Sequence, residues 1–177
     1  MLFKKKDKSM IQAAKLLYVK IIYQSRDKRF YTKLSVPDTL DGRFELIVLH
    51  FFFVYNLLKE NNKETLSEEI TKVMFKDFDM SLREMGVGDL SVGKKIYFMN
   101  ESLAGRIKAY KVALKEGKKS IYNALKRNIY GTLPNIKNDQ LKIMTDYFVD
   151  SLNLIKINNF IEFTEKDDIF LNLNKYT

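Results

Sequence analysis

Helical periodicity is the feature of this 177-residue sequence that most restricts its fold. Apolar residues recur three and four positions apart over long stretches, and only two prolines and seven glycines interrupt them. This spacing places the apolar side chains on one face of an α-helix. The length corresponds to about one domain, since domains usually hold ~100–200 residues. We therefore predict an all-α fold, in which residues 1–177 form a single compact bundle of about six to seven helices.

Six helices can be placed approximately. Residues 46–58 are the most apolar stretch, but these 13 residues include His50 and Asn56. A helix that spans a bilayer needs about 20 residues, so we expect a buried core helix here. The predicted helices cover about residues 8–25, 38–59, 65–85, 89–116, 120–130 and 139–154. The tail from residue 155 onward, with its apolar segments 160–163 and 169–171, fits a strand or a helix.

Side chains are expected to cap three of these helices. The pair Asp38 and Thr39 precedes the second helix, and a capping box from Thr65 to Glu68 opens the third. Asp89 or Ser91 is the expected cap of the fourth. In the first helix, the inward face is predicted to hold Ile11, Ala14, Leu17, Tyr18, Ile21 and Ile22, with Lys15 and Lys20 opposite.

Composition excludes several kinds of chemistry. The chain has no cysteine, which excludes disulfides, thiolate metal sites, iron-sulfur ligation and cysteine nucleophiles. Its one histidine, His50, excludes a two-histidine metal site or a histidine relay within one chain. His50 lies in an apolar run, so we expect a satisfied core or groove histidine. We predict no catalytic residue, no metal and no cofactor.

The charge balance favours anionic partners. The formal net charge is +9, and residues 101–130 hold eight basic and two acidic side chains. RNA, an acidic membrane surface or an acidic protein would suit such a chain, whereas we expect no DNA partner. A solvated helix face explains the basic region equally well. Tyr110, Tyr122 and Tyr130 within it could stack on bases, but their helical spacing favours packing in the core.

Residues 88–95 fit the first seven positions of a phosphate-binding P-loop. However, Lys95 stands where a serine or threonine hydroxyl should hold magnesium, and the preceding segment has helical rather than strand periodicity. We therefore predict a tight joint between two helices, broken by glycines at 86 and 88. Asp79 and Arg83 nearby have the i,i+4 spacing of an ion pair on a helix.

The central third of the chain resembles a known family. The resemblance rests on Asp38-Thr39-x-Asp41-Gly42-Arg43-Phe44-Glu45-Leu46, on Leu82-Arg83-Glu84-Met85-Gly86-Val87-Gly88-Asp89-Leu90-x-Val92-Gly93-Lys94 and on Gly105-Arg106-x-x-Ala109-Tyr110. Across about residues 36–115 the sequence is similar to the ubiquinol-cytochrome c chaperone family, which comprises assembly factors for the respiratory cytochrome bc complex, complex III.

This resemblance implies an all-helical, non-enzymatic chaperone that binds newly synthesised cytochrome b until haem and subunits are added. Its further implied partners are a small partner protein, the ribosome exit region and the cytoplasmic face of the inner membrane. We accordingly expect a cytoplasmic protein, or one peripheral at that membrane. Two rival hypotheses are a basic RNA-binding, ribosome-docking or membrane-surface adaptor without client specificity, and a nucleotide-dependent enzyme built on residues 88–94.

Holding a membrane protein requires an accessible apolar groove, for which methionine and aromatic side chains are well suited. We expect such a groove around the glycine turn, formed by Met74, Phe75, Phe78, Met80, Met85, Phe98 and Met99. The residues predicted to contact the client or partner, or to shape the groove, are Arg43, His50, Asp79, Arg83, Glu84, Met85, Gly86, Gly88, Asp89, Gly93, Lys94, Arg106 and Tyr110. Gly42 is expected to shape the backbone with the other glycines. A purely structural role, in which the polar side chains cap and pair helices, is the alternative.

Overall fold

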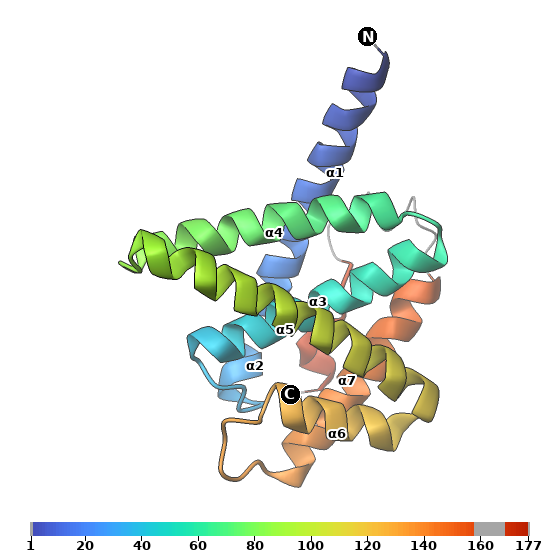
Figure 1. The fold of residues 1–177 in the computed structure, drawn as a ribbon. Helices are drawn as coiled ribbons and strands as arrows, with labels where there is room; N and C mark the ends of the chain where they lie inside the picture. Colours follow the sequence, from blue (N-terminus) through green and yellow to red (C-terminus); the bar gives the residue numbers. More distant parts are fainter. Residues whose placement is uncertain (1, 158–168, 177) are drawn as a thin grey trace.

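A computed structural model describes residues 2–157 and 169–176 of the chain. This part of the chain holds seven α-helices, one short 3-10 helix and no strand, which confirms the all-α prediction (Figure 1). The elements are α1 (Leu2–Ser25), α2 (Lys28–Thr32), α3 (Leu40–Glu60), α4 (Glu64–Glu84), α5 (Asp89–Glu116), α6 (Lys118–Asn128), α7 (Asn138–Ile157) and η1 (Leu173–Lys175).

Helix α3 is the centre of the fold. Every residue from 48 to 54 is buried, so this helix is covered all round. It packs against α1, α4, α5 and α7, as expected of a helix that is apolar on every face. The prediction of a buried core helix at residues 46–58 is therefore confirmed.

Helices α4 and α5 form a long hairpin on one side of α3 (Figure 1). Helix α1 crosses α4, and its N-terminal turns extend beyond the body of the molecule. On the other side, α6 packs against α5 and α7. The α1–α4 crossing and the α4–α5 hairpin therefore make α4 the helix that separates two faces of the molecule.

Two of the three predicted caps are wrong. Thr39 does cap α3, because its Oγ1 accepts a hydrogen bond from the Gly42 amide at 3.1 Å. Helix α4, however, starts at Glu64 with no side-chain cap, so Thr65 already lies inside the helix and its predicted capping box does not form. Helix α5 starts after Gly88, and neither Asp89 nor Ser91 caps it.

Short elements near both ends of the chain escaped prediction. Helix α2 has only five residues, three of them polar at its ends, but its Phe30 is fully buried. The expectation of a strand or a helix at residues 169–171 is wrong, because this segment has no regular secondary structure, although Ile169, Phe170 and Leu173 are buried against the helices. The predicted apolar segment 160–163 lies outside the described residues.

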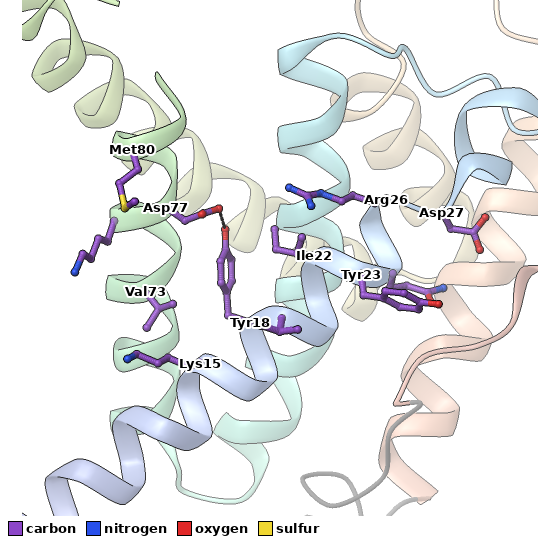
Figure 2. Close-up of a pocket in the computed structure, with 12 residues that line it drawn as sticks. Lys15, Tyr18, Ile22, Tyr23, Arg26, Asp27, Val73, Asp77 and Met80 are labelled. Atoms are coloured by element: carbon purple, nitrogen blue, oxygen red, sulfur yellow. Dashed lines mark hydrogen bonds between the residues drawn. The ribbon is translucent and has the colours of Figure 1, made fainter. Parts of the chain in front are cut away.

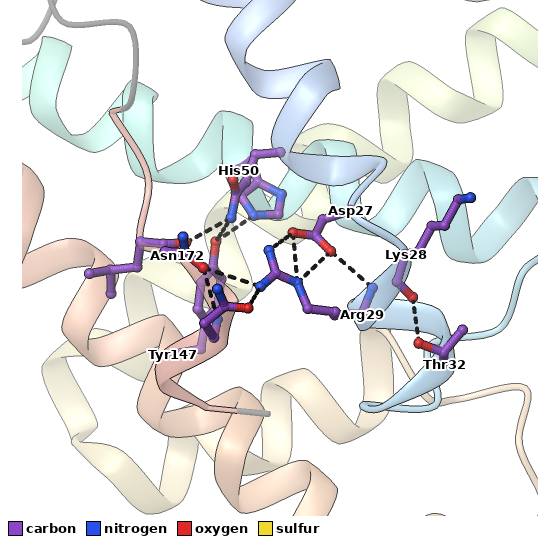
Figure 3. Close-up of polar contacts among 10 residues, drawn as sticks. Asp27, Lys28, Arg29, Thr32, His50, Tyr147 and Asn172 are labelled. Carbon is purple, nitrogen blue, oxygen red and sulfur yellow. Dashed lines mark hydrogen bonds and ion pairs between the residues drawn. The ribbon is translucent and has the colours of Figure 1, made fainter.

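A buried polar network joins α1, α3, α7 and the C-terminal segment around His50 (Figure 3). The Nδ1 atom lies 2.7 Å from the Leu46 carbonyl, which can only accept, so Nδ1 carries the proton. The Nε2 atom accepts from the Tyr147 hydroxyl at 2.8 Å. Gln24 donates to Tyr147 Oη and to the Leu171 carbonyl, both at 3.0 Å. Burial lowers the pKa of His50 to about 4, so a neutral, satisfied core histidine is confirmed.

Candidate functional site

The α1–α4 groove is an open hollow of about 790 Å³ between these two helices (Figure 2). On each helix its residues are spaced three and four positions apart, so each helix contributes one stripe of side chains. The residues that line the groove are Lys15, Tyr18, Val19, Ile22, Tyr23, Gln24, Arg26 and Asp27 from α1 and its end, and Val73, Lys76, Asp77 and Met80 from α4.

The floor of the groove is apolar and exposed. Val19 is 63% exposed, Tyr23 76% and Met80 52%, values unusual for large apolar side chains that lie close together. Nothing in the described part of the chain covers them. Such a surface suits another apolar side chain or helix, because burying it removes apolar area from water.

One partly buried hydrogen bond holds the two sides of the groove together. The Tyr18 hydroxyl donates to Asp77 Oδ2 at 2.7 Å, which joins α1 to α4. Burial and the neighbouring Asp77 carboxylate raise the pKa of Tyr18 well above its usual value, so the hydroxyl stays protonated and keeps donating.

The rim of the groove carries basic side chains. Of its two carboxylates, Asp77 accepts from Tyr18, and Asp27 accepts from Arg29 Nε at 2.9 Å, a bond that lowers the pKa of Asp27. Lys15, Arg26 and Lys76 make no side-chain ion pair within the described residues. The groove therefore combines an apolar floor with open positive charge, whereas no group of three or more potential metal ligands occurs among the described residues.

Several predicted site residues form ion pairs at the α4–α5 turn instead of lining the groove. Arg83 Nε donates to Asp79 Oδ1 at 2.7 Å, so the predicted i,i+4 pair is confirmed. Arg83 also pairs with Asp89 at the start of α5, and this contact bridges the turn. Glu84, Met85 and Lys94 lie exposed beside it. This exposed group of charges forms the tip of the α4–α5 hairpin.

The remaining predicted site residues are dispersed. Arg43 is exposed and pairs with Asp38, whereas His50 and Tyr110 lie in the core. The Tyr110 ring packs against Phe52 at a centroid distance of 5.3 Å. Arg106 pairs with the buried Glu45. The structure therefore does not bring all thirteen predicted residues to one place.

The positions of the glycines near the α4–α5 turn differ in whether they require glycine. Gly86 has φ +81°, a conformation that favours glycine, and it ends α4 as predicted. Gly88 has φ −63°, and a Cβ on Gly88 or Gly93 would meet open space. Neither of those two positions requires glycine for backbone conformation or space.

The single apolar groove predicted around the glycine turn is wrong. Met74 and Phe78 are buried in the core, so they cannot form an open surface. Met80 lines the α1–α4 groove, but Phe98 and Met99 line a second hollow that also includes Leu82 of α4. Met80 and Leu82 point to different sides of α4, because two helical positions differ by about 200°.

The α1 side of the groove escaped prediction. We assigned the outer face of this helix to solvent because it carries Lys15 and Lys20, but Leu16, Val19 and Tyr23 share that side and are exposed. Their spacing of three and four was the available signal. Ile11, predicted to face inward, is 40% exposed because α1 extends past the helices that cover its later turns.

The P-loop hypothesis is wrong for a structural reason. Residues 89–95 form the first turns of α5 and Gly88 is its N-cap, and a helix rather than a buried strand precedes them. The tight helix joint predicted instead is confirmed. Within the described ranges 2–157 and 169–176, we find no helix with the length and apolarity needed to cross a membrane.

Comparisons with known proteins identify a matching family and a solved structure of similar fold. Residues 32–157 match a protein family described as ubiquinol-cytochrome C chaperone. The crystal structure of the Cbp3 homolog from Brucella abortus superposes with a TM-score of 0.83 and 29% sequence identity, covering 99% of this chain and 98% of that chain. A comparison with curated proteins gives no match.

Proposed function

This chain belongs to the ubiquinol-cytochrome C chaperone family, and on that basis we propose that it is an assembly chaperone for ubiquinol-cytochrome c reductase. In this role it binds newly synthesised cytochrome b and holds it until haem and further subunits are added. The role requires no catalysis. The Ser25–His50 contact, at 3.0 Å, is buried and has no access to a substrate.

The exposed apolar floor of the α1–α4 groove is the observation that carries this proposal. A membrane subunit presents apolar helices before insertion, and a helix laid into a groove buries one stripe of its side chains. Burying each large apolar side chain contributes about 1.5–3 kcal/mol before the costs of association. Together, Val19, Tyr23 and Met80 thus favour tight but reversible binding of a client helix.

Open positive charge on the groove supports a location at the inner membrane. Lys15, Arg26 and Lys76 surround the apolar floor, and each basic residue near an anionic bilayer contributes about 1 kcal/mol. We propose that the chaperone acts at the cytoplasmic face of that membrane, near the ribosome exit region. A small partner protein is a further proposed component.

Removing the chaperone from its own cell tests the proposed function. We expect the level of assembled reductase, and the rate of quinol oxidation through cytochrome c, to fall. Wild-type protein and the Val112→Glu variant should restore both, because Val112 is exposed on α5 away from the groove. A Val19→Glu, Met80→Glu double variant should not. Undiminished quinol oxidation in the deletion strain would end the proposal.

The ion pairs of Arg83 at the hairpin tip provide a separate test of the predicted contact residues. We propose that this tip also touches the client. Arg83→Glu should lower the amount of assembled reductase without changing the helical circular dichroism of the purified protein, because the pairs are exposed. A normal level of reductase would show that Arg83 only joins the two helices.

RNA binding at the ribosome is a second candidate, favoured by one observation. Lys108, Lys115, Lys119 and Lys126 on α5 and α6 are exposed and make no ion pair within the described residues. If this face binds RNA, the affinity should fall steeply and linearly with the logarithm of salt concentration. Binding to a structured RNA in fluorescence anisotropy at several salt concentrations measures this slope.

A further inference from the structure

A second hollow, the α3–α5 cleft, lies across α4 from the groove and has a volume of about 540 Å³. It is bounded by the first turns of α3, by α5 and by the segment that follows α6. The residues that line it are Leu40, Asp41, Gly42, Phe44, Glu45, Leu82, Lys95, Phe98, Met99, Ser102, Arg106, Arg127, Asn128, Ile129, Gly131 and Thr132.

The walls of the cleft have a defined construction. Helix α5 contributes positions 95, 98, 99, 102 and 106, a continuous stripe at helical spacing. A Cβ on Gly42 would lie 1.9 Å from the Pro37 carbonyl oxygen, and one on Gly131 would lie 2.3 Å from the Arg127 carbonyl oxygen. Both walls therefore depend on glycine for close backbone contact, unlike the open positions Gly88 and Gly93.

A fixed guanidinium lies in this cleft. Glu45 is buried and accepts from Arg106 Nε at 3.0 Å and from Arg106 Nη2 at 2.7 Å. These two bonds hold the guanidinium plane in one orientation. The Nη1 atom of Arg106 has no partner among the described residues, so this edge of the guanidinium is available to a ligand.

Other donors converge on the same cleft. Lys95 and Arg127 make no ion pair or hydrogen bond through their side chains within the described residues. The lining contains two acidic side chains. Glu45 is paired with Arg106, and Asp41 has no ion pair within the described residues, so hydrogen-bond donors outnumber the open acceptors.

We infer that the α3–α5 cleft binds an acidic, amphipathic peptide segment of a partner protein. Its carboxylate would meet Arg106, Lys95 and Arg127, and its apolar side chains would pack against the accessible side chains of Phe98 and Met99. A planar guanidinium matches a carboxylate in geometry, and the apolar half of the lining suits a peptide better than a free inorganic anion. This inference does not depend on the proposed function, because the cleft shares no lining residue with the α1–α4 groove.

Calorimetric titration with two matched hexapeptides tests the inference on the full chain. The probes are acetyl-Phe-Leu-Glu-Asp-Leu-Phe-amide and its neutral counterpart acetyl-Phe-Leu-Gln-Asn-Leu-Phe-amide. We expect the acidic peptide to bind at least about tenfold more tightly, because each charge-assisted hydrogen bond contributes on that scale. Lys95→Glu and Arg127→Glu should each remove most of this preference.

Lys115→Glu is the matched control, since it changes the net charge equally at an exposed position outside the cleft. It should bind the acidic peptide within about twofold of wild type. Circular dichroism verifies that every variant is folded. The inference is overturned if neither peptide binds, if both bind equally, or if Lys115→Glu weakens binding as much as Arg127→Glu.

Sedimentation with phosphatidylglycerol vesicles distinguishes a peptide from a lipid as the ligand. If the two peptides bind equally, and Arg127→Glu abolishes binding to the vesicles, the cleft binds lipid instead of an acidic peptide.

Discussion

At the scale of single residues, His50 shows how a polar group can belong to a core. Its ring is fully buried, yet both nitrogens have partners, on α3 and α7. The rings of Phe30, Phe53 and Phe170 pack around it edge-on. Sequence predicted the burial, because His50 lies in an apolar run and has no metal-binding companion. It did not predict Gln24 and Tyr147 as partners, since those residues approach only through the tertiary fold.

Acidification should destabilise the protein through His50. Its pKa is about 4 when folded and close to 6.5 when unfolded, so below pH 6.5 the unfolded chain takes up a proton that the folded chain does not. The free energy of unfolding should fall by up to about 1.4 kcal/mol per pH unit between these values, or by about 1.6 kcal/mol in total from pH 6.5 to pH 5. Urea unfolding at a series of pH values measures this slope.

His50→Gln is the control for that measurement, and its unfolding free energy should depend much less on pH in this range. Glu45 acts in the opposite direction, because burial raises its pKa, and its effect is common to both proteins. The imidazole carbon and proton resonances report the titration directly, since the chain has one histidine. A midpoint near pH 6.5 in the folded protein would contradict the buried network.

Glycine substitutions separate a required glycine from a permissive one. Gly42→Ala brings a Cβ against the Pro37 carbonyl oxygen and should lower the free energy of unfolding by about 3 kcal/mol. Gly93→Ala meets open space inside α5 and should raise it by about 0.5–1 kcal/mol, since alanine favours helix. Chemical denaturation of the two variants checks both signs. If the two variants change the free energy of unfolding equally, the Pro37 carbonyl does not lie against Gly42 in solution.

At the scale of elements, the helices around α3 join the core through one face, whereas α3 itself is covered all round, and the proposed function depends on the faces left open. Apolar spacing predicted the long helices to within a few residues, except that α1 begins at Leu2 rather than near residue 8. Helix α2 was missed because five residues are too few to show a period. The caps of α4 and α5 were misplaced because Thr65, Asp89 and Ser91 are suitable residue types but already lie in the first turn, whereas Lys63 and Gly88 occupy the N-cap positions.

The docking of α1 on α4 depends on the hydrogen bond between Tyr18 and Asp77. Tyr18→Phe removes the donor without changing the apolar shape, and we expect a loss of about 1 kcal/mol in the free energy of unfolding. Tyr23→Phe is a matched control, because this exposed hydroxyl has no partner among the described residues, and it should leave stability unchanged. Equal stability of both variants and wild type in urea unfolding would show that packing alone holds α1 in place.

At the scale of the whole molecule, α4 separates two hollows with different chemistry. The α1–α4 groove is apolar with a basic rim, whereas the α3–α5 cleft contains the ion pair between the buried Glu45 and the partly exposed Arg106. The sequence indicated many of the residues involved, such as Met80, Phe98 and Arg106, but joined them into one groove. Spacing along a helix shows which residues share a face, but not which neighbouring helix covers that face. Because α1 packs against α4, Met80 lies in the α1–α4 groove and not in the α3–α5 cleft.

Recovery of cytochrome b with the purified chaperone tests the central claim most directly. Tagged wild-type protein, isolated from detergent-solubilised membranes of cells that are synthesising the reductase, should retain cytochrome b that lacks haem. The Val19→Glu, Met80→Glu variant should lose it, because two charges replace the exposed floor of the groove, while Val112→Glu retains it. If wild type carries no cytochrome b, or if the folded groove variant carries as much as wild type, the α1–α4 groove is not where this chain holds its client.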